Sequence, residues 1–524
     1  MRMNHTTLAV IVGLGGLLFG FEATVISGAI GFITLQFGLA DWQTGLVVAA
    51  STLGAVAASV SVTALADRVG RKPVLMTLAA LYAISATCAA LSNGFPALVA
   101  ARIIGGYAFG SLSLAPIYVA EIAPPERRGR LIACNQLSIM LGFSAAYFAN
   151  YLLLRASGSQ APLALRLGLA EHAWRYMLGL QIVPALAWFA LLTRVPESPR
   201  WLILRGRERE ARAILGRLVD RDGVERLIGE VRRREALTGV REQLHRLVLP
   251  QRRHILIVAL VLAAAQQICG INAVYFYAPT IFEQSGVGTD AAFAQAVLIG
   301  VTNLVFTIVA MLLIDRIGRR PLLLAGMAGI TLSLTTLAIG FGQAEFRLSP
   351  AAATELAGRT GRPALAELGG KTFDSDVAFK TALANALPRS QRKALEPELL
   401  ARAIRLDAAL VLLAVLGFVA SFAFSIGPVM WVMLAEIFSN AARGVGMAIA
   451  GLVNAIVSFV VQVLFPIQLT HIGSAGIFAL YAAASAISGL LIFRLVPETR
   501  GRSLEALESD LTARHPVCHA LSEI

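Results

Sequence analysis

Asp67-Arg68-Val69-Gly70-Arg71-Lys72 occurs in the first half of the chain, and Asp315-Arg316-Ile317-Gly318-Arg319-Arg320 is its counterpart in the second half. Each copy joins two long apolar stretches. Glycine permits a turn tight enough to reverse the chain, while the flanking charges suit the head-group region of a bilayer. A signature of this kind, present once in each half, predicts two similar helical bundles that lie together in a membrane.

Composition agrees with this interpretation. The 524 residues are 57% hydrophobic and 15% charged, with a mean hydropathy of +0.71. That is too little charge to cover a water-soluble surface of this size, so we expect lipid to be the solvent. Twelve apolar runs of about 20 residues can each cross a hydrocarbon core of about 30 Å. They cover 8–30, 44–65, 74–92, 97–119, 131–153, 175–194, 254–278, 291–314, 321–342, 407–433, 445–470 and 475–495. The predicted fold is an all-α membrane protein of twelve transmembrane helices in two pseudo-symmetric six-helix bundles.

The net charge of +13 indicates orientation rather than a nucleic-acid partner. Lysine and arginine cluster between spans 2 and 3, 4 and 5, 6 and 7, and 8 and 9, whereas the short loops on the other face contain neither residue. By the positive-inside rule, both termini lie in the cytoplasm. We therefore expect a multi-pass protein of the plasma membrane, specifically a bacterial inner membrane, that binds no nucleic acid. The first run is interpreted as a retained span, because it is too long for a signal peptide and lacks an obvious cleavage site.

Two polar segments interrupt the short loops. Residues 196–253 are predicted as a cytoplasmic helical linker between an N-terminal bundle, 1–195, and a C-terminal bundle, 254–498. Residues 343–405 form an insert on the opposite face with amphipathic stretches at 374–386 and 390–405, which predict a small helical cap. The insert is interpreted as a tolerated loop expansion, or as a gating lid or partner-binding surface. Residues 499–524 are expected to be a cytoplasmic tail.

The cysteines and histidines do not show the spacing of a metal-binding site. Cys88, Cys134 and Cys269 fall within predicted spans and Cys518 in the tail, without the spacing of a metal site or a disulfide framework. The seven histidines are scattered and show no ligand spacing. We expect neither a metal nor any other cofactor.

Charged residues recur at the predicted cytoplasmic edge of both halves. Carboxylate and guanidinium pairs at such positions can clamp neighbouring helix ends when that side is closed and separate when it opens. The alternative is that they only determine topology and form weak surface pairs. The candidates are Asp67, Arg71, Glu121, Arg128, Glu197, Arg200, Asp315, Arg319, Glu436, Arg443, Glu498 and Arg500.

Several further motifs follow one another in order. They are Gly16-Leu17-Leu18-Phe19-Gly20, Val25-Ile26-Ser27-Gly28, Pro196-Glu197-Ser198-Pro199-Arg200-Trp201-Leu202, Gln266-Gln267 through Gly270-Ile271-Asn272 to Tyr277-Ala278-Pro279, Gly427-Pro428 through Trp431 to Glu436, and Pro497-Glu498-Thr499-Arg500-Gly501. With the two Asp-Arg-x-Gly-Arg turns, they make nearly the whole chain resemble a sugar porter of the major facilitator superfamily. The resemblance is strongest to the bacterial sugar/proton symporters.

The polar residues within the spans independently favour a neutral, hydroxylated ligand. Unpaired polar groups are costly in a membrane, so these amides need partners. An amide both donates and accepts, which matches a pair of sugar hydroxyls, although the amides could instead bond to one another between helices. Gly270 and Gly427-Pro428 mark places where a span can bend to line a cavity. The amides are Gln136, Gln266, Gln267, Asn272, Asn303 and Asn454.

The resemblance adds roles to these positions. It implies that Gln136, Gln266, Gln267, Asn272, Asn303 and Trp431 hold the sugar and that Phe19 borders the site. The indole of Trp431 can lie against the C–H face of a sugar ring. Two positions depart from the family pattern: Phe276 replaces a frequent tyrosine, and Ala455 stands where many members have a tryptophan. Which sugar is carried therefore stays open.

Glu22 in span 1 and Arg102 in span 4 are rare intramembrane charges. A pair whose separation changes with conformation can take up a proton in one state and release it in another, whereas a static pair would only join two helices. The family's symporters usually have aspartate at the Glu22 position and an arginine matching Arg102. We therefore expect proton-coupled sugar import by alternating access, carried out by a monomer. The alternatives are an uncoupled sugar or polyol facilitator and a transporter-like sugar sensor. No catalytic constellation suggests an enzyme.

Overall fold

The computed structural model describes residues 4–216, 224–225, 228–229, 253–438 and 443–500. All twelve predicted spans are confirmed as helices long and apolar enough to cross a membrane. Five of these spans consist of two shorter helices or of part of a longer one. The helices of the first half are α1 His5–Gln36, α2 Asp41–Val69, α3 Arg71–Ala90, α4 Phe95–Ala108, α5 Ser111–Ile122, α6 Pro125–Ser157, α7 Pro162–Arg166, α8 Leu169–Gly179 and α9 Ile182–Leu192.

The second half repeats the pattern with one large addition. Its helices are α14 Arg253–Ile268, α15 Ile271–Phe276, α16 Ala278–Glu283, α17 Thr289–Ile317, α18 Arg319–Gly342, α22 Ala408–Phe424, α23 Ile426–Ile437, α24 Arg443–His471 and α25 Gly473–Leu495. In the segment of sequence that connects the halves, the structure has two short helices, α10 Pro199–Leu204 and α11 Glu208–Leu215. The first helical stretch predicted for the linker, 205–219, overlaps α11. Most of the second stretch, 224–237, lies outside the described residues.

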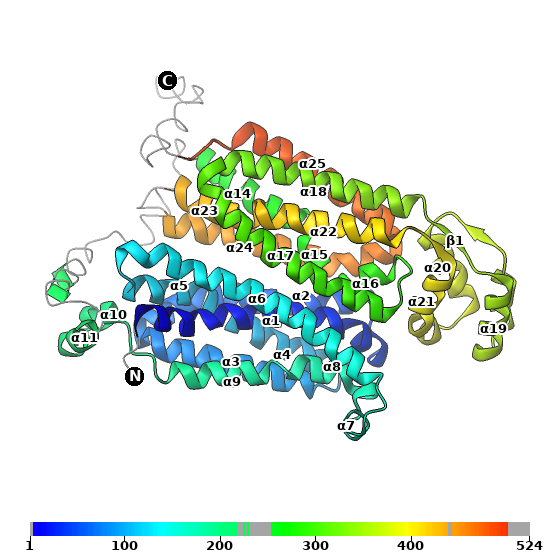
Figure 1. Ribbon diagram of the computed structural model, residues 1–524, viewed down its shortest axis with the longest axis horizontal. Helices are drawn as coiled ribbons and strands as arrows, with labels where there is room; N and C mark the ends of the chain where they lie inside the picture. The colour runs from blue at the N-terminus through cyan, green and yellow to red at the C-terminus, as the bar shows by residue number, and fades with distance from the viewer. Residues whose placement is uncertain (1–3, 217–223, 226–227, 230–252, 439–442, 501–524) are drawn as a thin grey trace, which may run out of the picture.

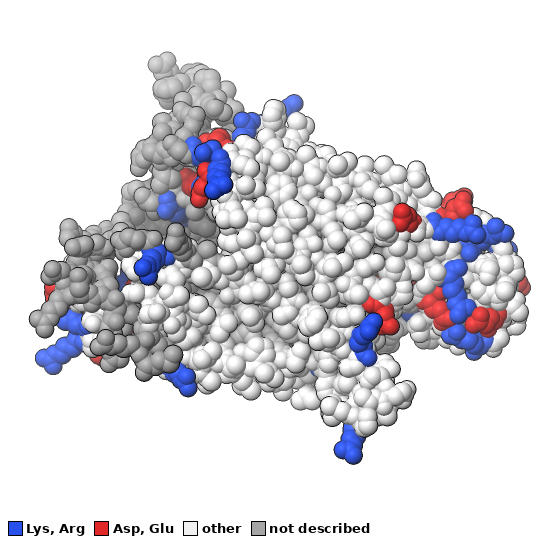
Figure 2. Space-filling model, viewed as in Figure 1, with Lys and Arg blue, Asp and Glu red and all other residues white. Residues whose placement is uncertain are grey.

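The two halves lie side by side with their helices roughly parallel to the long axis of the molecule (Figure 1). The cap, residues 343–405, projects from one end, which we call the cap end. The short helices α10 and α11 lie at the opposite end, the linker end, where α1 also begins. Across the boundary between the halves, α2 packs along α24 and α6 along α17. The broad middle of the surface shown in Figure 2 carries almost no charge, and charged side chains gather at the two ends. This distribution fits a protein surrounded by lipid.

The halves meet most closely near the cap end. A Cβ atom on Gly45 of α2 would collide with the backbone of Val463 on α24, so the two helices touch there through their main chains. Tyr147 Oη of α6 donates to the carbonyl of Tyr275 at 2.6 Å, and Ser144 Oγ donates to the carbonyl of Gly300 at 2.8 Å. These contacts close the cap end of the interface.

The repeated signature forms equivalent turns at the linker end. Gly70 ends α2 and precedes α3 with φ of 111°, and Gly318 joins α17 to α18 with φ of 105°. Residues with side chains rarely adopt these angles, which explains why glycine occupies both centres. The carboxylates of Glu197 and Glu498 lie directly against the two glycines.

The cap is a small folded unit. Three short strands, β1 Glu345–Arg347, β2 Thr372–Phe373 and β3 Ile404–Arg405, form a sheet in the order β2-β1-β3, with both pairs antiparallel. The helices are α19 Pro350–Thr360, α20 Asp376–Ala386 and α21 Arg389–Ala403, with the 3-10 helix η2 Pro363–Leu368. The two amphipathic stretches predicted from the sequence correspond to α20 and α21. Apolar side chains of all these elements form a separate core, in which Phe346, Phe379 and Leu399 are fully buried.

Candidate functional site

Four predicted amides meet where α14, α15 and α24 adjoin. Gln266 and Gln267 lie in the last turn of α14, which is interrupted at Gly270 with φ of 86° before α15 begins. Asn272 lies in α15 and Asn454 faces them from α24. The break at Gly270 brings residues on both sides of it to the same place, as expected for a span that unwinds to line a polar site.

The amides bond to one another. Asn454 Nδ2 donates to Gln266 Oε1 at 2.8 Å and to the carbonyl of Ala263 at 2.9 Å, and Gln267 Nε2 donates to Asn454 Oδ1 at 3.1 Å. Asn272 Nδ2 donates to Gln267 Oε1 at 2.7 Å. All the polar groups concerned are uncharged. The site can thus exchange hydrogen bonds with a neutral ligand without a change in net charge.

A second interrupted span contributes backbone carbonyls. Gln266 Nε2 donates to the carbonyls of Ile426 and Gly427, at 3.2 and 2.9 Å. These residues follow Ser425, whose φ of −125° and ψ of −107° separate α22 from α23. The bend predicted at Gly427-Pro428 is thus present, but it lies at Ser425, two to three residues earlier than the motif suggested.

The network continues through residues that the sequence reasoning did not select. Asn272 Nδ2 also donates to Ser458 Oγ at 2.5 Å, and Gln462 Nε2 donates to the same oxygen at 2.8 Å. Gln462 further donates to Thr52 Oγ1 of α2 at 3.2 Å, which connects the network to the other half. Ser458 and Gln462 lie one and two turns after Asn454 on α24. Polar residues at i, i+4 and i+8 share one face of a helix, and this spacing on an otherwise apolar helix could have indicated both residues from the sequence.

The remaining predicted residues lie around this network. Asn303 of α17 donates to Met140 Sδ of the first half at 3.1 Å. Gln136 is half-buried on α6, and the Trp431 side chain on α23 is 42% exposed. Phe19 contacts Phe109 and Phe143 edge to face.

The ring of Phe143 contacts Tyr275 of α15 at 5.3 Å between centroids, and Tyr275 in turn contacts Phe422. A chain of aromatic rings therefore leads from Phe19 in the first half to α22 in the second. The sequence reasoning selected Phe19 but not Phe143, Tyr275 or Phe422.

Glu22 and Arg102 form a buried ion pair within the first half. Arg102 Nη1 lies 3.8 Å from Glu22 Oε1, and the two residues are 2% and 3% exposed, respectively. Arg102 Nε also donates to the carbonyl of Val47 on α2 at 2.9 Å, so the guanidinium is held by a second helix as well. The side chain of Gln181, 1% exposed, lies within interaction range of the Glu22 carboxylate. Gln181 was not selected from the sequence.

At the linker end of the first half, Arg71 is the centre of a charged network. Its guanidinium donates to both carboxylate oxygens of Glu121, at 3.1 and 3.2 Å, and lies 2.9 Å from Asp67. The Glu197 carboxylate accepts the backbone N–H of Arg71 at 2.9 Å. Ser198 Oγ donates to Glu121 at 2.6 Å. The network joins helices of one half.

The second half repeats this network around Arg319. Its guanidinium donates to Glu436 at 2.8 Å and lies 3.1 Å from Asp315, while Glu498 accepts its backbone N–H at 3.1 Å. Thr499 Oγ1 donates to Glu436 at 2.5 Å, in the role that Ser198 has in the first half. The other four candidates are less central. Arg200 and Arg500 are exposed, Arg443 is half-buried, and the side chain of Arg128 lies outside the described residues.

Known proteins resemble this chain over nearly its whole length. The family described as "Sugar (and other) transporter" matches residues 8–354 and 400–511 and leaves 355–399, most of the cap, uncovered. The D-xylose-proton symporter of Escherichia coli K12 is 30% identical, over 96% of this chain and 95% of its own. The arabinose-proton symporter of Bacillus subtilis is 32% identical, over 95% of this chain and 92% of its own.

Solved structures give the same result. The inward open conformation of the xylose transporter XylE from E. coli matches with a TM-score of 0.71 and 27% identity, over 96% of this chain and 99% of that one. Its partially occluded inward open conformation matches with a TM-score of 0.70. The family match, the relatives and the solved structures all agree with the twelve helical spans. The chain therefore belongs to the sugar porter family of the major facilitator superfamily, and it is a transporter and not an enzyme.

Proposed function

We propose that this protein is a proton-coupled symporter that imports a neutral monosaccharide, a hexose or a pentose, by alternating access. The amide network carries the substrate part of this proposal. Gln266, Gln267, Asn272 and Asn454 place several uncharged donors and acceptors at the junction of two interrupted spans. A sugar offers the same kind of groups in return.

The present bonds among the amides support a simple exchange. A sugar hydroxyl can donate one hydrogen bond and accept another. When it displaces a bond between two amides, it therefore satisfies both freed groups, and the net free-energy cost of the exchange is small. We infer that Gln136, Asn303, Trp431 and Phe19 complete the site from the neighbouring helices. The exposed indole of Trp431 is suited to contact a sugar ring as the ligand enters.

The proton part of the proposal rests on Glu22 and Arg102. The pair is buried, and Arg102 is held by α2 carbonyls while Glu22 belongs to α1. A movement of α1 relative to α2 and α4 would change the separation of the two charges and hence the proton affinity of the carboxylate. Relatives named as arabinose-proton and D-xylose-proton symporters support the same assignment.

We further propose that the linker end faces the cytoplasm of a bacterial cell. The positively charged loops lie at this end, as the positive-inside rule requires. The halves touch at the cap end, whereas the charged networks at the linker end each join helices of one half. This state corresponds to an inward-facing transporter, and the similarity to inward open XylE supports that view.

A two-step experiment tests the function. Thermal unfolding of the purified protein is first measured with a panel of hexoses, pentoses and polyols, and the stabilising compounds are then used for uptake into proteoliposomes. We expect a monosaccharide to stabilise the protein, and we expect its accumulation to require an inward proton gradient and to collapse with an uncoupler. Uptake that only equilibrates, with or without the uncoupler, would indicate a facilitator instead. Binding without transport would indicate a sensor.

A further inference from the structure

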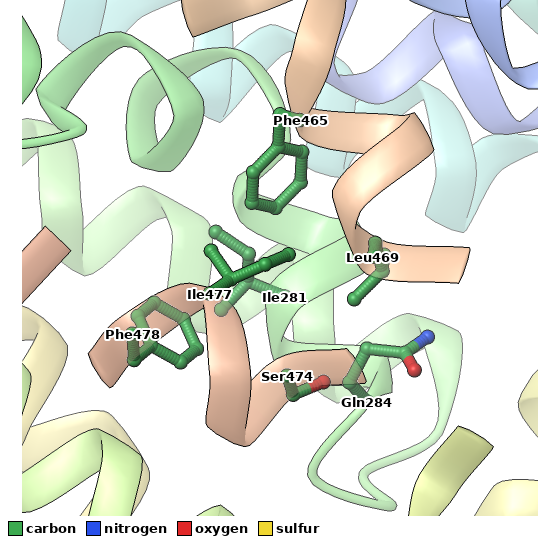
Figure 3. A pocket seen from close by; sticks show the side chains of 7 residues that line it. All are labelled: Ile281, Gln284, Phe465, Leu469, Ser474, Ile477 and Phe478. Atoms are coloured by element: carbon green, nitrogen blue, oxygen red, sulfur yellow. The ribbon is translucent and has the colours of Figure 1, made fainter. Parts of the chain in front are cut away.

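The cap is firmly attached to the second half. Its chain continues directly from α18 and into α22, and α20 docks on the end of that half. The Asp376 carboxylate accepts the backbone N–H of Ser474 at 2.9 Å and its hydroxyl at 3.1 Å. Lys380 Nζ donates to Gln284 Oε1 at 2.6 Å. Figure 3 shows Gln284 and Ser474 next to each other, beside a small apolar pocket of α16, α24 and α25.

The cap is built to move as one body. Its core is separate from that of the bundles, and its sheet ties β1 to both β2 and β3. Arg359 pairs with Glu398 at 2.9 Å, and Arg402 pairs with Glu355 at 2.9 Å, which joins α19 to α21. Charges of both signs cover this end of the surface (Figure 2).

A contact on the other side of the cap reaches the first half. Lys393 of α21 donates from Nζ to the carbonyl of Leu39 at 3.0 Å and lies 3.5 Å from Asp41 Oδ1. Leu39 belongs to the turn between α1 and α2, and Asp41 is the first residue of α2. The cap thus bridges two halves that must separate at this end when an alternating-access transporter opens here.

Beneath the bridge lies a cavity of about 740 Å³. Thr34 and Thr44 line it from the first half, Tyr277 and Phe465 from the second, and Lys380 and Lys393 from the cap. The volume falls within the range of about 300–1,000 Å³ typical of small-molecule pockets.

We propose that the cap is a lid carried by the second half, and that Lys393 latches it to the turn between α1 and α2 whenever the cap end is closed. The family match leaves 355–399, most of this lid, uncovered. The inference rests on the alternating-access part of the proposed function and is independent of which solute is carried. The latch stabilises the closed cap end, and every opening of this end breaks the contacts of Lys393 with Leu39 and Asp41.

Distances between spin labels test the lid directly. Cys88, Cys134, Cys269 and Cys518 are first replaced, and the full-length protein is studied in lipid nanodiscs without sugar. One label is placed on the cap at Glu367→Cys, and the other either on the first half at Glu171→Cys or on the second half at Asp290→Cys. All three side chains are exposed. Double electron–electron resonance then measures both distances in each background.

We expect the distance from the cap to the first half to show two populations. In Lys393→Ala the longer one should increase about threefold to tenfold, as expected for the loss of a partly exposed ion pair and a charged hydrogen bond. Lys393→Arg should restore the original ratio. Arg402→Ala removes the ion pairs of Arg402 with Glu355 and Glu398 within the cap and serves as the matched control, with no increase expected. The distance from the cap to the second half should stay single throughout.

Three results would overturn the proposal. In the first, the distance to the first half is single and unchanged in every variant. In the second, Arg402→Ala has the same effect as Lys393→Ala. In the third, the cap moves relative to the second half and keeps its distance to the first. A failure to bind or transport any sugar in the panel would reject the proposed substrate, and it would leave these distance measurements unaffected.

Discussion

At the scale of single residues, Glu22 is the side chain with the clearest functional consequence. We predict that Glu22→Gln abolishes accumulation of sugar against a gradient but preserves exchange of sugar across the membrane. The amide keeps the size and polarity of the side chain but cannot carry the proton. Proteoliposomes with an imposed pH gradient measure accumulation, and counterflow measures exchange.

The matched control for this prediction is Glu283→Gln. Glu283 lines the cavity under the cap rather than the centre of the first half, so this variant should still accumulate sugar. Accumulation driven by a pH gradient in Glu22→Gln would show that another group couples the proton.

Gln267 is expected to bind the sugar directly, so its substitution should raise KM. It donates to Asn454 and accepts from Asn272, so its side chain links two elements of the network. We expect Gln267→Ala to raise KM for the transported sugar about tenfold to a hundredfold, because one or two hydrogen bonds to the ligand are lost. Gln295→Ala removes an amide of α17 outside this set and should leave KM within a factor of two or so. Equal effects of the two substitutions would contradict the assignment.

The residues of the site were only partly predictable. The amides could be found because an amide in an apolar span requires a partner. The sequence could not tell which of them bond together, since that depends on helix rotation and on the breaks at Gly270 and Ser425. Gln462 carried the same signal as Asn454 and was overlooked. Gln181 lies at the N-terminus of α9, and only the folded chain brings it next to Glu22.

At the scale of elements, the two linker-end networks are equivalent in pattern but differ in burial. The Glu121 side chain is 5% exposed and that of Glu436 is 28% exposed. We predict that Glu121→Gln lowers the free energy of unfolding by about 2 kcal/mol and Glu436→Gln by about 1 kcal/mol or less, since exposed pairs contribute little. Thermal unfolding in detergent gives the order of the two variants. Equal losses would mean that burial does not set the strength of these networks.

The helix α16 carries a group that titrates near neutral pH. It follows the seventh span, which ends at Phe276, and therefore lies beyond the membrane-spanning helix. Burial raises the pKa of Glu283 to about 7; an opposing hydrogen bond with Thr289 lowers it, and the Glu396 carboxylate adds to the rise. Between pH 4.5 and 7 the folded protein binds this proton more tightly than the unfolded chain does. The stabilising contribution is therefore complete below pH 4.5 and is lost as the pH rises through 7.

We predict that Glu283→Gln makes thermal stability less dependent on pH over this window. The measurement compares the unfolding temperatures of wild type and variant from pH 4.5 to 8. Asp290→Asn, which changes an exposed carboxylate on the neighbouring helix α17, should retain the wild-type slope. An unchanged slope in Glu283→Gln would assign the titration to another group.

Elements were predicted better than their ends. Each apolar run is helical, in one piece or in two, because lipid forces the backbone to satisfy its own hydrogen bonds. The first run was expected to end at residue 30, whereas α1 continues to Gln36. The cap was indicated by amphipathic spacing in α20 and α21. Its three strands were not predicted, because pairs of two or three residues leave no periodic signal.

At the scale of the whole molecule, the cap and the bundles should be separable. β1 and β3 pair with Phe346 opposite Ile404, which places Arg347 opposite Ala403. Replacing 348–402 by Asn-Gly should therefore close the two strands as a tight hairpin. We expect the shortened protein to remain monodisperse, to keep its helical content and to be stabilised by the same sugars. Circular dichroism, gel filtration and thermal unfolding provide the measurements, and aggregation of the variant would show that the bundles depend on the cap.

The architecture as a whole followed from composition and repetition. Two copies of one charged turn predicted two bundles, and the absence of charge from long stretches predicted the broad uncharged surface seen in Figure 2. The packing of the two halves against each other could not be predicted from the sequence. It depends on close backbone approaches, such as Gly45 to Val463, that neither half encodes alone.

The antiparallel pairing of β1 with β3 has a practical consequence for imaging. A 55.5 kDa protein embedded mostly in lipid offers few landmarks for aligning particles in electron cryo-microscopy. Because β1 ends at Arg347 and the adjacent strand β3 begins at Ile404, a compact foreign domain can be grafted between them with both of its ends fixed. Such a graft would stand out from the membrane as a rigid marker and report the tilt of the half that bears it.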